Sequence, residues 1–131
     1  AQKAKKVYGI EMIKPAVINA KENAKNNNIK NVEFIIGDTV EVMPKLYQEG
    51  VKPDVIVVDP PRAGCEKSVL ETFAKMQPSK IVYVSCNPAS LARDIAILAE
   101  HNYQALKIQP VDMFSQTSHV ECVALIQRRT M

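Results

Sequence analysis

The short stretch at residues 81–85, of which four are aliphatic or aromatic, limits the possible folds more than any other segment, because the sequence turns polar directly after it. Continuous apolar runs of this length are typical of strands buried on both faces of a parallel sheet. The next residues are Cys86, Asn87 and Pro88. Proline suits the first turn of a helix, and an asparagine before it can cap the helix by accepting a backbone N–H. The segment therefore predicts a strand, a turn and a helix, with Cys86 at the carboxyl end of the strand.

The same succession of strand and helix repeats along the chain. Apolar strands are expected at residues 6–11, 32–36, 54–59, 80–85, 103–111 and 119–127, and helices at 15–26, 39–47, 68–76 and 88–101. This order, β-α-β-α-β-α-β-α-β-β, predicts an α/β fold with a doubly wound, mainly parallel sheet. No helix separates the last two strands, so the final strand is expected to run antiparallel.

Local patterns add detail to the helices. Thr39 is expected to cap the second helix. Helical spacing predicts the core-facing side chains of the first and last helices, which are Ile13, Val17, Ala20 and Ala24, and Leu91, Ile95 and Leu98.

The composition indicates one globular domain. The chain has 131 residues, 47% of them hydrophobic and 24% charged, which is enough for a single core. The net charge of +3 permits an anionic partner without requiring one. Three cysteines without C-x-x-C spacing argue against a disulfide framework and a metal site, and indicate a reducing, cytoplasmic setting. No stretch is long and apolar enough to span a membrane. Residues 1–6 lead straight into the first strand, which suggests part of a longer protein.

Polar side chains stand at the ends of four predicted strands: Glu11, Asp38, Asp59 and Cys86. The carboxyl ends of parallel strands share one edge, so these side chains are expected to line one crevice. A carboxylate accepts two hydrogen bonds from a ribose diol, which suits Glu11, and Asp38 can reach an adenine amino group. Alternatively, each acid caps the following helix or turn. For Asp38 the two interpretations are equally supported.

The segment Asp59-Pro60-Pro61-Arg62 predicts a rigid, extended loop, since two consecutive prolines fix the backbone. Such a loop can hold a planar base beside a cofactor. Amino-methylating enzymes stack the base on an aromatic residue that follows D-P-P, and Arg62 in that place weakens an exocyclic-amine interpretation. A structural Pro-Pro turn remains an alternative.

Of the cysteines, Cys86 is the candidate nucleophile. It precedes a helix N-terminus, where the dipole favours a thiolate. Cys65, in a loop, and Cys122, in the last strand, are expected to serve packing. A phosphatase loop requires C-x5-R, but Arg93 lies seven residues after Cys86, which excludes that chemistry.

Glu121 is the candidate base, in the segment His119-Val120-Glu121-Cys122 that opens the last strand. A carboxylate in apolar surroundings can accept a proton. The alternative is a solvated edge residue, and His119 alone is as easily a structural hydrogen-bonding group.

Three segments together resemble the uracil-C5 RNA methyltransferases. These are Asp59–Arg62, the sequence S-C-N-P-A-S-L-A-R-D at 85–94, and residues 112–121 with the His119-x-Glu121 pair. The similarity covers nearly the whole chain. It implies a class I, Rossmann-like methyltransferase domain of which residues 1–131 form the carboxyl-terminal portion. It further implies S-adenosylmethionine as cofactor and RNA as substrate, with large-subunit ribosomal RNA favoured over transfer RNA.

The resemblance assigns roles to the candidate residues. Cys86 adds to carbon 6 of uracil, and the resulting enolate attacks the sulfonium methyl through carbon 5. Glu121 then removes the carbon 5 proton. Asp59 contacts the cofactor or the uracil edge, and Arg62 stabilises the enolate oxygen. Glu11 and Asp38 match the family's ribose and adenine positions.

One departure separates this chain from the family pattern. The family's first strand and glycine-rich loop, which cradles the methionine end of the cofactor, do not precede Glu11. Residues 1–131 alone are therefore expected to bind cofactor weakly and to be inactive, and unpaired sheet edges could promote self-association. Two rivals remain: an amino-methyltransferase using Asp59-Pro60-Pro61, whose chemistry needs no cysteine, and a non-catalytic RNA-interaction module.

Overall fold

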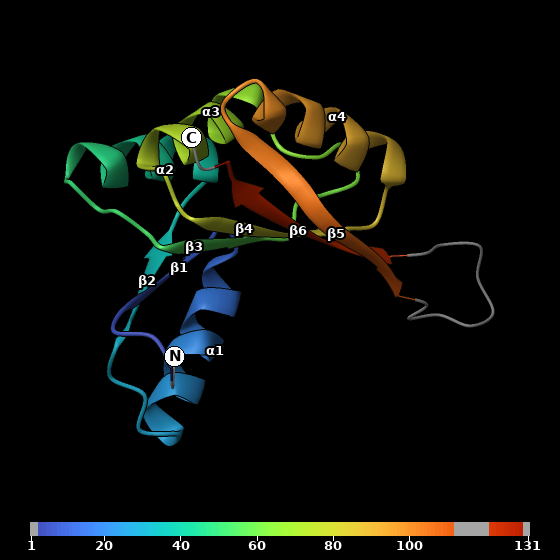
Figure 1. The fold of residues 1–131 in the computed structure, drawn as a ribbon. Helices are drawn as coiled ribbons and strands as arrows, with labels where there is room; N and C mark the ends of the chain where they lie inside the picture. The colour runs from blue at the N-terminus through green and yellow to red at the C-terminus, as the bar shows by residue number, and fades with distance from the viewer. Residues whose placement is uncertain (1–2, 112–120, 130–131) are drawn as a thin grey trace. The chain divides into compact units, whose positions relative to one another are not determined.

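The computed structural model describes residues 3–111 and 121–129, which form six strands and four helices (Figure 1). In chain order these are β1 (Val7–Glu11), α1 (Lys14–Asn26), β2 (Val32–Ile36), α2 (Thr39–Gln48), β3 (Val55–Val58), α3 (Lys67–Met76), β4 (Lys80–Ser85), α4 (Pro88–Ala99), β5 (Tyr103–Val111) and β6 (Glu121–Arg128). The order confirms the predicted alternation. The chain divides into two compact units, residues 1–46 and 47–131.

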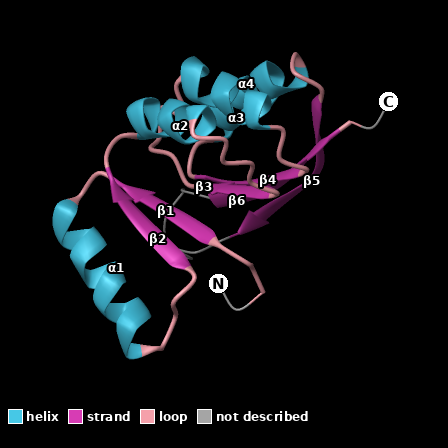
Figure 2. Ribbon diagram, turned by 90° about the vertical axis from the view of Figure 1, so that its left-hand side faces the viewer, coloured by secondary structure: helices cyan, strands magenta, loops and turns pink. Residues whose placement is uncertain are grey.

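In the first unit, β1 and β2 form a parallel pair with α1 packed beside them (Figure 2). The register runs from Val7 opposite Val32 to Glu11 opposite Ile36. Val17 of α1 is buried as expected, but Ile13 is 60% exposed, contrary to the predicted helical face. Ile13 occupies the N-cap in an extended conformation, so helical spacing does not apply to it.

The start of α2 corrects a second expectation. The backbone N–H of Val40 donates to Asp38 Oδ1 at 3.0 Å, and the N–H groups of Glu41 and Val42 donate to the Asp38 carbonyl. Asp38 is therefore the capping residue, and Thr39 is already the first residue of the helix. The carboxylate accepts from the Val40 N–H, so the side-chain cap comes from one residue earlier than predicted.

The second unit is built on a four-stranded sheet with the order β3-β4-β6-β5. β3 and β4 run parallel, whereas β6 runs antiparallel to both β4 and β5. The predicted reversal of the last strand is thus confirmed, and β6 lies between two strands that point the other way. Figures 1 and 2 show α3 and α4 side by side over one face of this sheet. Within the described residues, no helix combines the length and apolar character needed to cross a membrane.

Strand β4 buries one face more fully than the other. Ile81 and Tyr83 are completely buried, while Val82 and Val84 are half-buried. The expected burial on both faces therefore holds only in part, because α3 and α4 cover a single face of this unit's sheet.

Helix α4 differs from the predicted pattern at its buried face. Leu91 and Leu98 are buried as expected, but the fully buried residue between them is Asp94, and Ile95 is only half-buried. A charged side chain occupies the core-facing position because its carboxylate finds partners there, as described below. The helix also ends at Ala99, two residues before the expected end at His101, since the chain turns through Asn102 at a φ of 70°.

Candidate active site

The turn that carries Cys86 is held by its two neighbours. Ser85 Oγ accepts a hydrogen bond from the Asn87 backbone N–H at 3.0 Å and donates to the Asn87 carbonyl at 2.9 Å. Asn87 Oδ1 accepts from the Ala89 backbone N–H at 3.1 Å, which confirms the predicted cap of α4. Cys86 itself is half-buried. The backbone of Cys86 is thus held at the junction of β4 and the N-terminus of α4.

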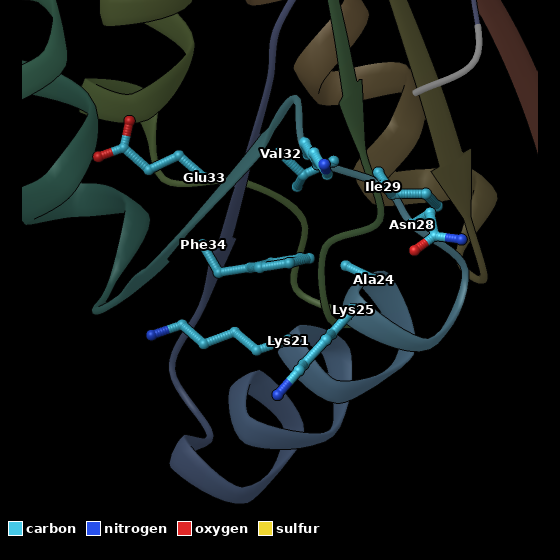
Figure 3. A pocket seen from close by; sticks show the side chains of 9 residues that line it. Lys21, Ala24, Lys25, Asn28, Ile29, Val32, Glu33 and Phe34 are labelled. Carbon is cyan, nitrogen blue, oxygen red and sulfur yellow. The ribbon is translucent and has the colours of Figure 1, made fainter.

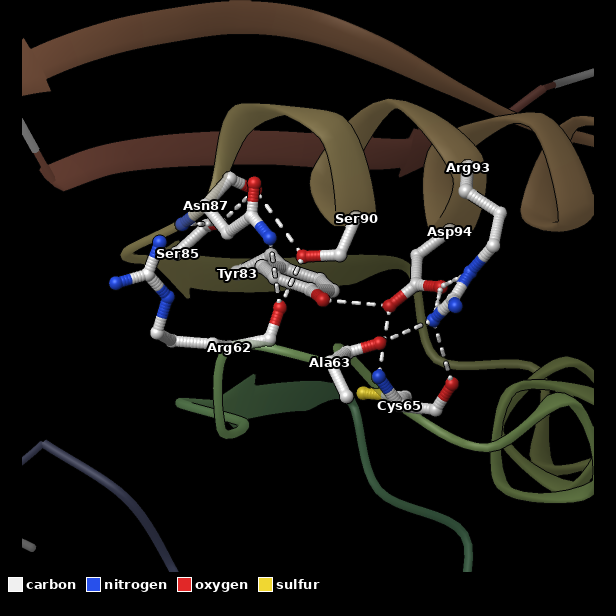
Figure 4. Close-up of polar contacts among 9 residues, drawn as sticks. All are labelled: Arg62, Ala63, Cys65, Tyr83, Ser85, Asn87, Ser90, Arg93 and Asp94. Atoms are coloured by element: carbon white, nitrogen blue, oxygen red, sulfur yellow. Dashed lines mark hydrogen bonds and ion pairs between the residues drawn. The ribbon is translucent and has the colours of Figure 1, made fainter.

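The loop that follows β3 is fastened to this turn. The carbonyl of Arg62 accepts a hydrogen bond from Asn87 Nδ2 at 3.0 Å and from Ser90 Oγ at 2.9 Å (Figure 4). A bond from the Gly64 N–H to the Pro61 carbonyl at 2.8 Å closes the loop into a tight turn. Asp59 and Arg62 are exposed, and no other described residue binds the Arg62 guanidinium. Both side chains are therefore open to solvent.

The register of β4 and β6 places Glu121 at the same end of the sheet. Ser85 pairs with Cys122, and this is the last pair of the ladder. Cys86 and Glu121 each lie one residue beyond it, on neighbouring strands. Side chains directly opposite each other in an antiparallel pair have Cβ atoms about 4.5–5.5 Å apart. The half-buried Glu121 is thus a neighbour of the Cys86 turn.

Glu11 and Asp38 come together in the other unit. Glu11 ends β1 opposite Ile36, and its carbonyl accepts from the Gly37 N–H at 3.0 Å, so Asp38 follows at the same edge. Each carboxylate uses one oxygen locally: Glu11 Oε1 accepts from the Ile13 N–H at 3.3 Å, and Asp38 Oδ1 caps α2. Among the described residues the second oxygen of each has no partner. Both capping and ligand binding are therefore open to Asp38.

The remaining cysteines differ from Cys86 in their surroundings. Cys65 is buried, and burial, reinforced by the nearby Asp94 carboxylate, raises the pKa of its thiol to about 12. The thiol therefore stays protonated and unreactive at neutral pH, which agrees with the predicted packing role. Cys122 is half-buried within β6, between Ser85 of β4 and Pro110 of β5.

Two charged residues of α4 were missed as part of this site. Arg93 and Asp94 bind the loop after β3. Both belong to the segment 85–94 that carries the family resemblance, but the sequence assigned neither residue a role. The available signal was the position of Asp94 three residues after Leu91 and four before Leu98, on an apolar helix face. His119 and the predicted segment 112–114 lie outside the described residues.

A pocket in the first unit lies among residues other than the predicted site residues. This pocket, of about 510 Å³, lies between the end of α1 and the start of β2 (Figure 3). Its lining includes Lys21, Lys25, Lys30 and Phe34 but none of the candidate residues. Within residues 3–111 and 121–129, no group of three or more histidine, cysteine or acidic side chains is arranged to hold a metal ion.

The chain is similar to bacterial proteins described as RNA methyltransferases. Residues 1–129 match the sequence model of a family described as tRNA (uracil-5-)-methyltransferase. An RNA methyltransferase of Clostridium tetani is 58% identical over 126 residues, covering 96% of this chain and 27% of the relative. One from Bacillus cereus (strain ATCC 10987) is 55% identical over 128 residues, covering 98% and 28%. The chain thus spans little more than a quarter of the length of these relatives.

A solved structure supports the fold. The Pyrococcus abyssi tRNA (uracil-54, C5)-methyltransferase, crystallised with S-adenosyl-L-homocysteine, superposes with a TM-score of 0.81 at 36% sequence identity. The match covers 96% of this chain and 30% of the Pyrococcus chain. The arrangement of strands and helices is therefore that of a Rossmann-like methyltransferase fold.

Proposed function

Because this chain belongs to the tRNA (uracil-5-)-methyltransferase family, we propose that it forms the nucleophile-bearing part of a domain that methylates carbon 5 of uridine in RNA. The observation that carries the proposal is the position of Cys86 and Glu121 on neighbouring strands, each one residue beyond the Ser85–Cys122 pair. A thiol nucleophile and a carboxylate base are thereby offered to one substrate. The chemistry of uracil C5 methylation requires these two groups.

The proposed reaction uses the chain's own side chains at defined steps. The Cys86 thiolate forms a bond from Sγ to carbon 6 of uracil, and the electron pair of the C5–C6 double bond moves toward O4, giving an enolate. Arg62, whose guanidinium has no other described partner, stabilises that oxygen. After carbon 5 has been methylated, Glu121 removes its proton, the double bond re-forms and the thiolate leaves carbon 6. Asp59 holds the edge of the uracil or the cofactor.

We propose S-adenosylmethionine as the methyl donor; when bound, it supplies the methyl group as a sulfonium electrophile. The carboxylates of the first unit fit S-adenosylmethionine, since Glu11 and Asp38 share one sheet edge and each keeps one oxygen without a partner among the described residues. Those oxygens accept hydrogen bonds, as a ribose diol and an adenine amino group require.

The experiment that tests the proposal traps the adduct. Full-length protein, S-adenosylmethionine and RNA containing 5-fluorouridine should give a covalent complex on denaturing gels, because fluorine at carbon 5 cannot be removed as a proton. Cys86→Ala should abolish the complex, whereas Cys65→Ala should retain it. Ribosomal and transfer RNA are both offered, since the sequence resemblance favours the former and the Pyrococcus relative is a tRNA enzyme. Absence of any complex with the wild-type protein would refute the mechanism.

Glu121→Gln provides a second test with ordinary RNA. Without a base to remove the carbon 5 proton, the methylated adduct should accumulate, so a covalent complex forms without fluorine. If Cys86→Ala instead leaves methylation intact and the product is a methylated exocyclic amine, the Asp59-Pro60-Pro61 alternative is correct. If no methylation occurs while RNA still binds, the chain is an interaction module.

We further propose that residues 1–131 alone bind S-adenosylmethionine weakly, self-associate and lack activity. β1 and β3 lie in separate sheets, and each is paired on one side only among the described strands. β3 is an edge strand, and its Val55 and Val57 side chains are 49% and 69% exposed, so an unpaired backbone edge and apolar side chains are both open to another chain. Micromolar affinity in titration calorimetry, or a purely monomeric species in light scattering at high concentration, would count against these proposals.

A further inference from the structure

Two adjacent residues of α4 hold the loop that carries Asp59 and Arg62. Arg93 Nη2 donates hydrogen bonds to the Ala63 carbonyl at 2.7 Å and to the Cys65 carbonyl at 3.2 Å. Its Nε and Nη2 also bind Asp94 Oδ1 at 3.0 and 2.9 Å (Figure 4). One guanidinium therefore joins two loop carbonyls to a carboxylate of the helix.

Asp94 completes the joint from inside the core. Its side chain is fully buried, and its Oδ2 accepts hydrogen bonds from the Cys65 backbone N–H at 2.8 Å and from the Tyr83 hydroxyl at 2.5 Å. Burial, reinforced by the bond to Asp94, raises the pKa of Tyr83, so that its hydroxyl keeps the donated proton. Both carboxylate oxygens are thus occupied. A charge removed from water in this way is tolerated only when it is paired and hydrogen-bonded.

The loop lies directly against this pair. Gly64 adopts a φ of +82°, and a Cβ built on it would lie 2.6 Å from Arg93 Nη2 and 2.7 Å from Asp94 Oδ2. The same loop is held at Arg62 by Asn87 and Ser90. Contacts from the first two turns of α4 therefore fix the loop along its length, from Arg62 to Cys65.

We propose that Arg93 and Asp94 are positioning residues, which hold the loop after β3 in register with the Cys86 turn so that Arg62 and Asp59 face the uracil attached to Cys86. The inference rests on the proposed function, and adds to it the residues that set the alignment of the two halves of the site. Groups that align reacting partners act through geometry, and a misplacement of about 1 Å can cost about 100-fold in rate.

The choice of arginine supports this role. A planar guanidinium presents several N–H donors in a fixed fork, whereas a lysine ammonium is a single point charge on a flexible stem. Arg93 Nη2 contacts both loop carbonyls and Asp94 Oδ1, and Nε adds a second bond to Asp94. Lysine at position 93 keeps the charge beside Asp94, but its side chain ends one bond short of Nη2 and has no second nitrogen for Asp94. Arg93→Lys should therefore loosen the loop while preserving the charge balance.

The test compares Arg93→Lys with Arg128→Lys in the full-length protein. Arg128 also donates to a backbone carbonyl, that of Gln77 at 3.0 Å, but at the end of β6. For Arg93→Lys, amide exchange at Gly64 and Cys65 should rise about ten-fold. The kcat for methylation should fall about ten- to 100-fold, while the KM for S-adenosylmethionine stays nearly unchanged. Arg128→Lys should change neither exchange in the loop nor kcat.

Three results would separate the possibilities. Unchanged amide exchange at Gly64 and Cys65 would show that Arg93 does not hold the loop. Faster exchange with unchanged kcat would overturn the positioning role and leave a structural contact. If the wild-type protein forms no adduct with 5-fluorouridine RNA, the proposed function fails, while the exchange data still decide whether Arg93 fixes the loop.

Discussion

Replacing Gly64 with alanine should destabilise the protein by about 3 kcal/mol, through two separable effects. The first is the backbone: an L-residue in the left-handed region costs about 1–2 kcal/mol, offset by about 0.4–1 kcal/mol because the unfolded chain loses freedom. The second is steric, since the new Cβ lies 2.6 Å from Arg93 Nη2 and 2.7 Å from Asp94 Oδ2. Displacing either group breaks charge-assisted hydrogen bonds worth about 1.5–3 kcal/mol each.

Gly50 offers a matched control for the first effect. It lies in the same unit, its φ is +84°, and a Cβ built on it meets nothing within 4 Å. Gly50→Ala should therefore cost only about 1 kcal/mol. The difference in unfolding free energy between the two variants, about 2 kcal/mol, measures how much the hydrogen bonds of Arg93 and Asp94 to the loop stabilise the protein.

The assay is equilibrium unfolding in urea, followed by far-ultraviolet circular dichroism. Both variants should show the slope of the wild type and a lower midpoint, with the larger shift for Gly64→Ala. Equal midpoints for Gly64→Ala and Gly50→Ala would refute the reasoning, because the contact with Arg93 and Asp94 would then contribute nothing.

Two further predictions concern pH and the cap of α2. Burial raises the pKa of Cys65 to about 12 and also raises that of Tyr83, above ordinary values of about 8.5 and 10. The folded state holds these protons more tightly, so this contribution to stability is complete below about pH 8.5 and falls as the pH rises. Cys65→Ala should therefore flatten the decline of the urea midpoint between pH 8 and 11. A wild-type midpoint that does not change over this range would contradict the prediction. Asp38→Ala should lower stability by about 1 kcal/mol, whereas Asp38→Asn keeps the cap but should weaken S-adenosylmethionine binding in calorimetry, because its amide then presents N–H groups to the adenine amino group. Unchanged affinity of Asp38→Asn would leave Asp38 a capping residue only.

The order of the elements follows from short-range patterns, and these were readable in the sequence. The structure confirms three such predictions. The apolar runs form the strands β3 and β4, and Asn87 before Pro88 caps α4. The last strand runs antiparallel, as expected from the absence of a helix before it. Each depends on residues adjacent in the chain, where periodicity and capping chemistry act directly.

Contacts between distant segments were harder to predict. The sequence placed Ile95 on the buried face of α4, yet Asp94 is fully buried because Tyr83, Cys65 and Arg93 satisfy its oxygens. Hydrophobic periodicity predicts that an aspartate is exposed, because it gives no information on which hydrogen-bond donors will lie near the side chain after folding. The same limit hid the bonds from Arg93 to a loop some thirty residues earlier.

The reversed strand β6 also limits which insertions and deletions the gene can accept. Because successive side chains on a strand alternate between its two faces, losing or gaining one codon between 121 and 128 would shift the pairing with β4 by one residue and turn Glu121 away from Cys86. Strand β5 already contains one shift in its register, between Ala105 and Lys107. β6 separates β5 from β4, the strand that precedes Cys86. Length changes should therefore be tolerated in β5 and rejected in β6. If Glu121 is the proton acceptor, related sequences should show insertions and deletions in β5 but not in β6. If Glu121 has no role in catalysis, the two strands should vary in length equally.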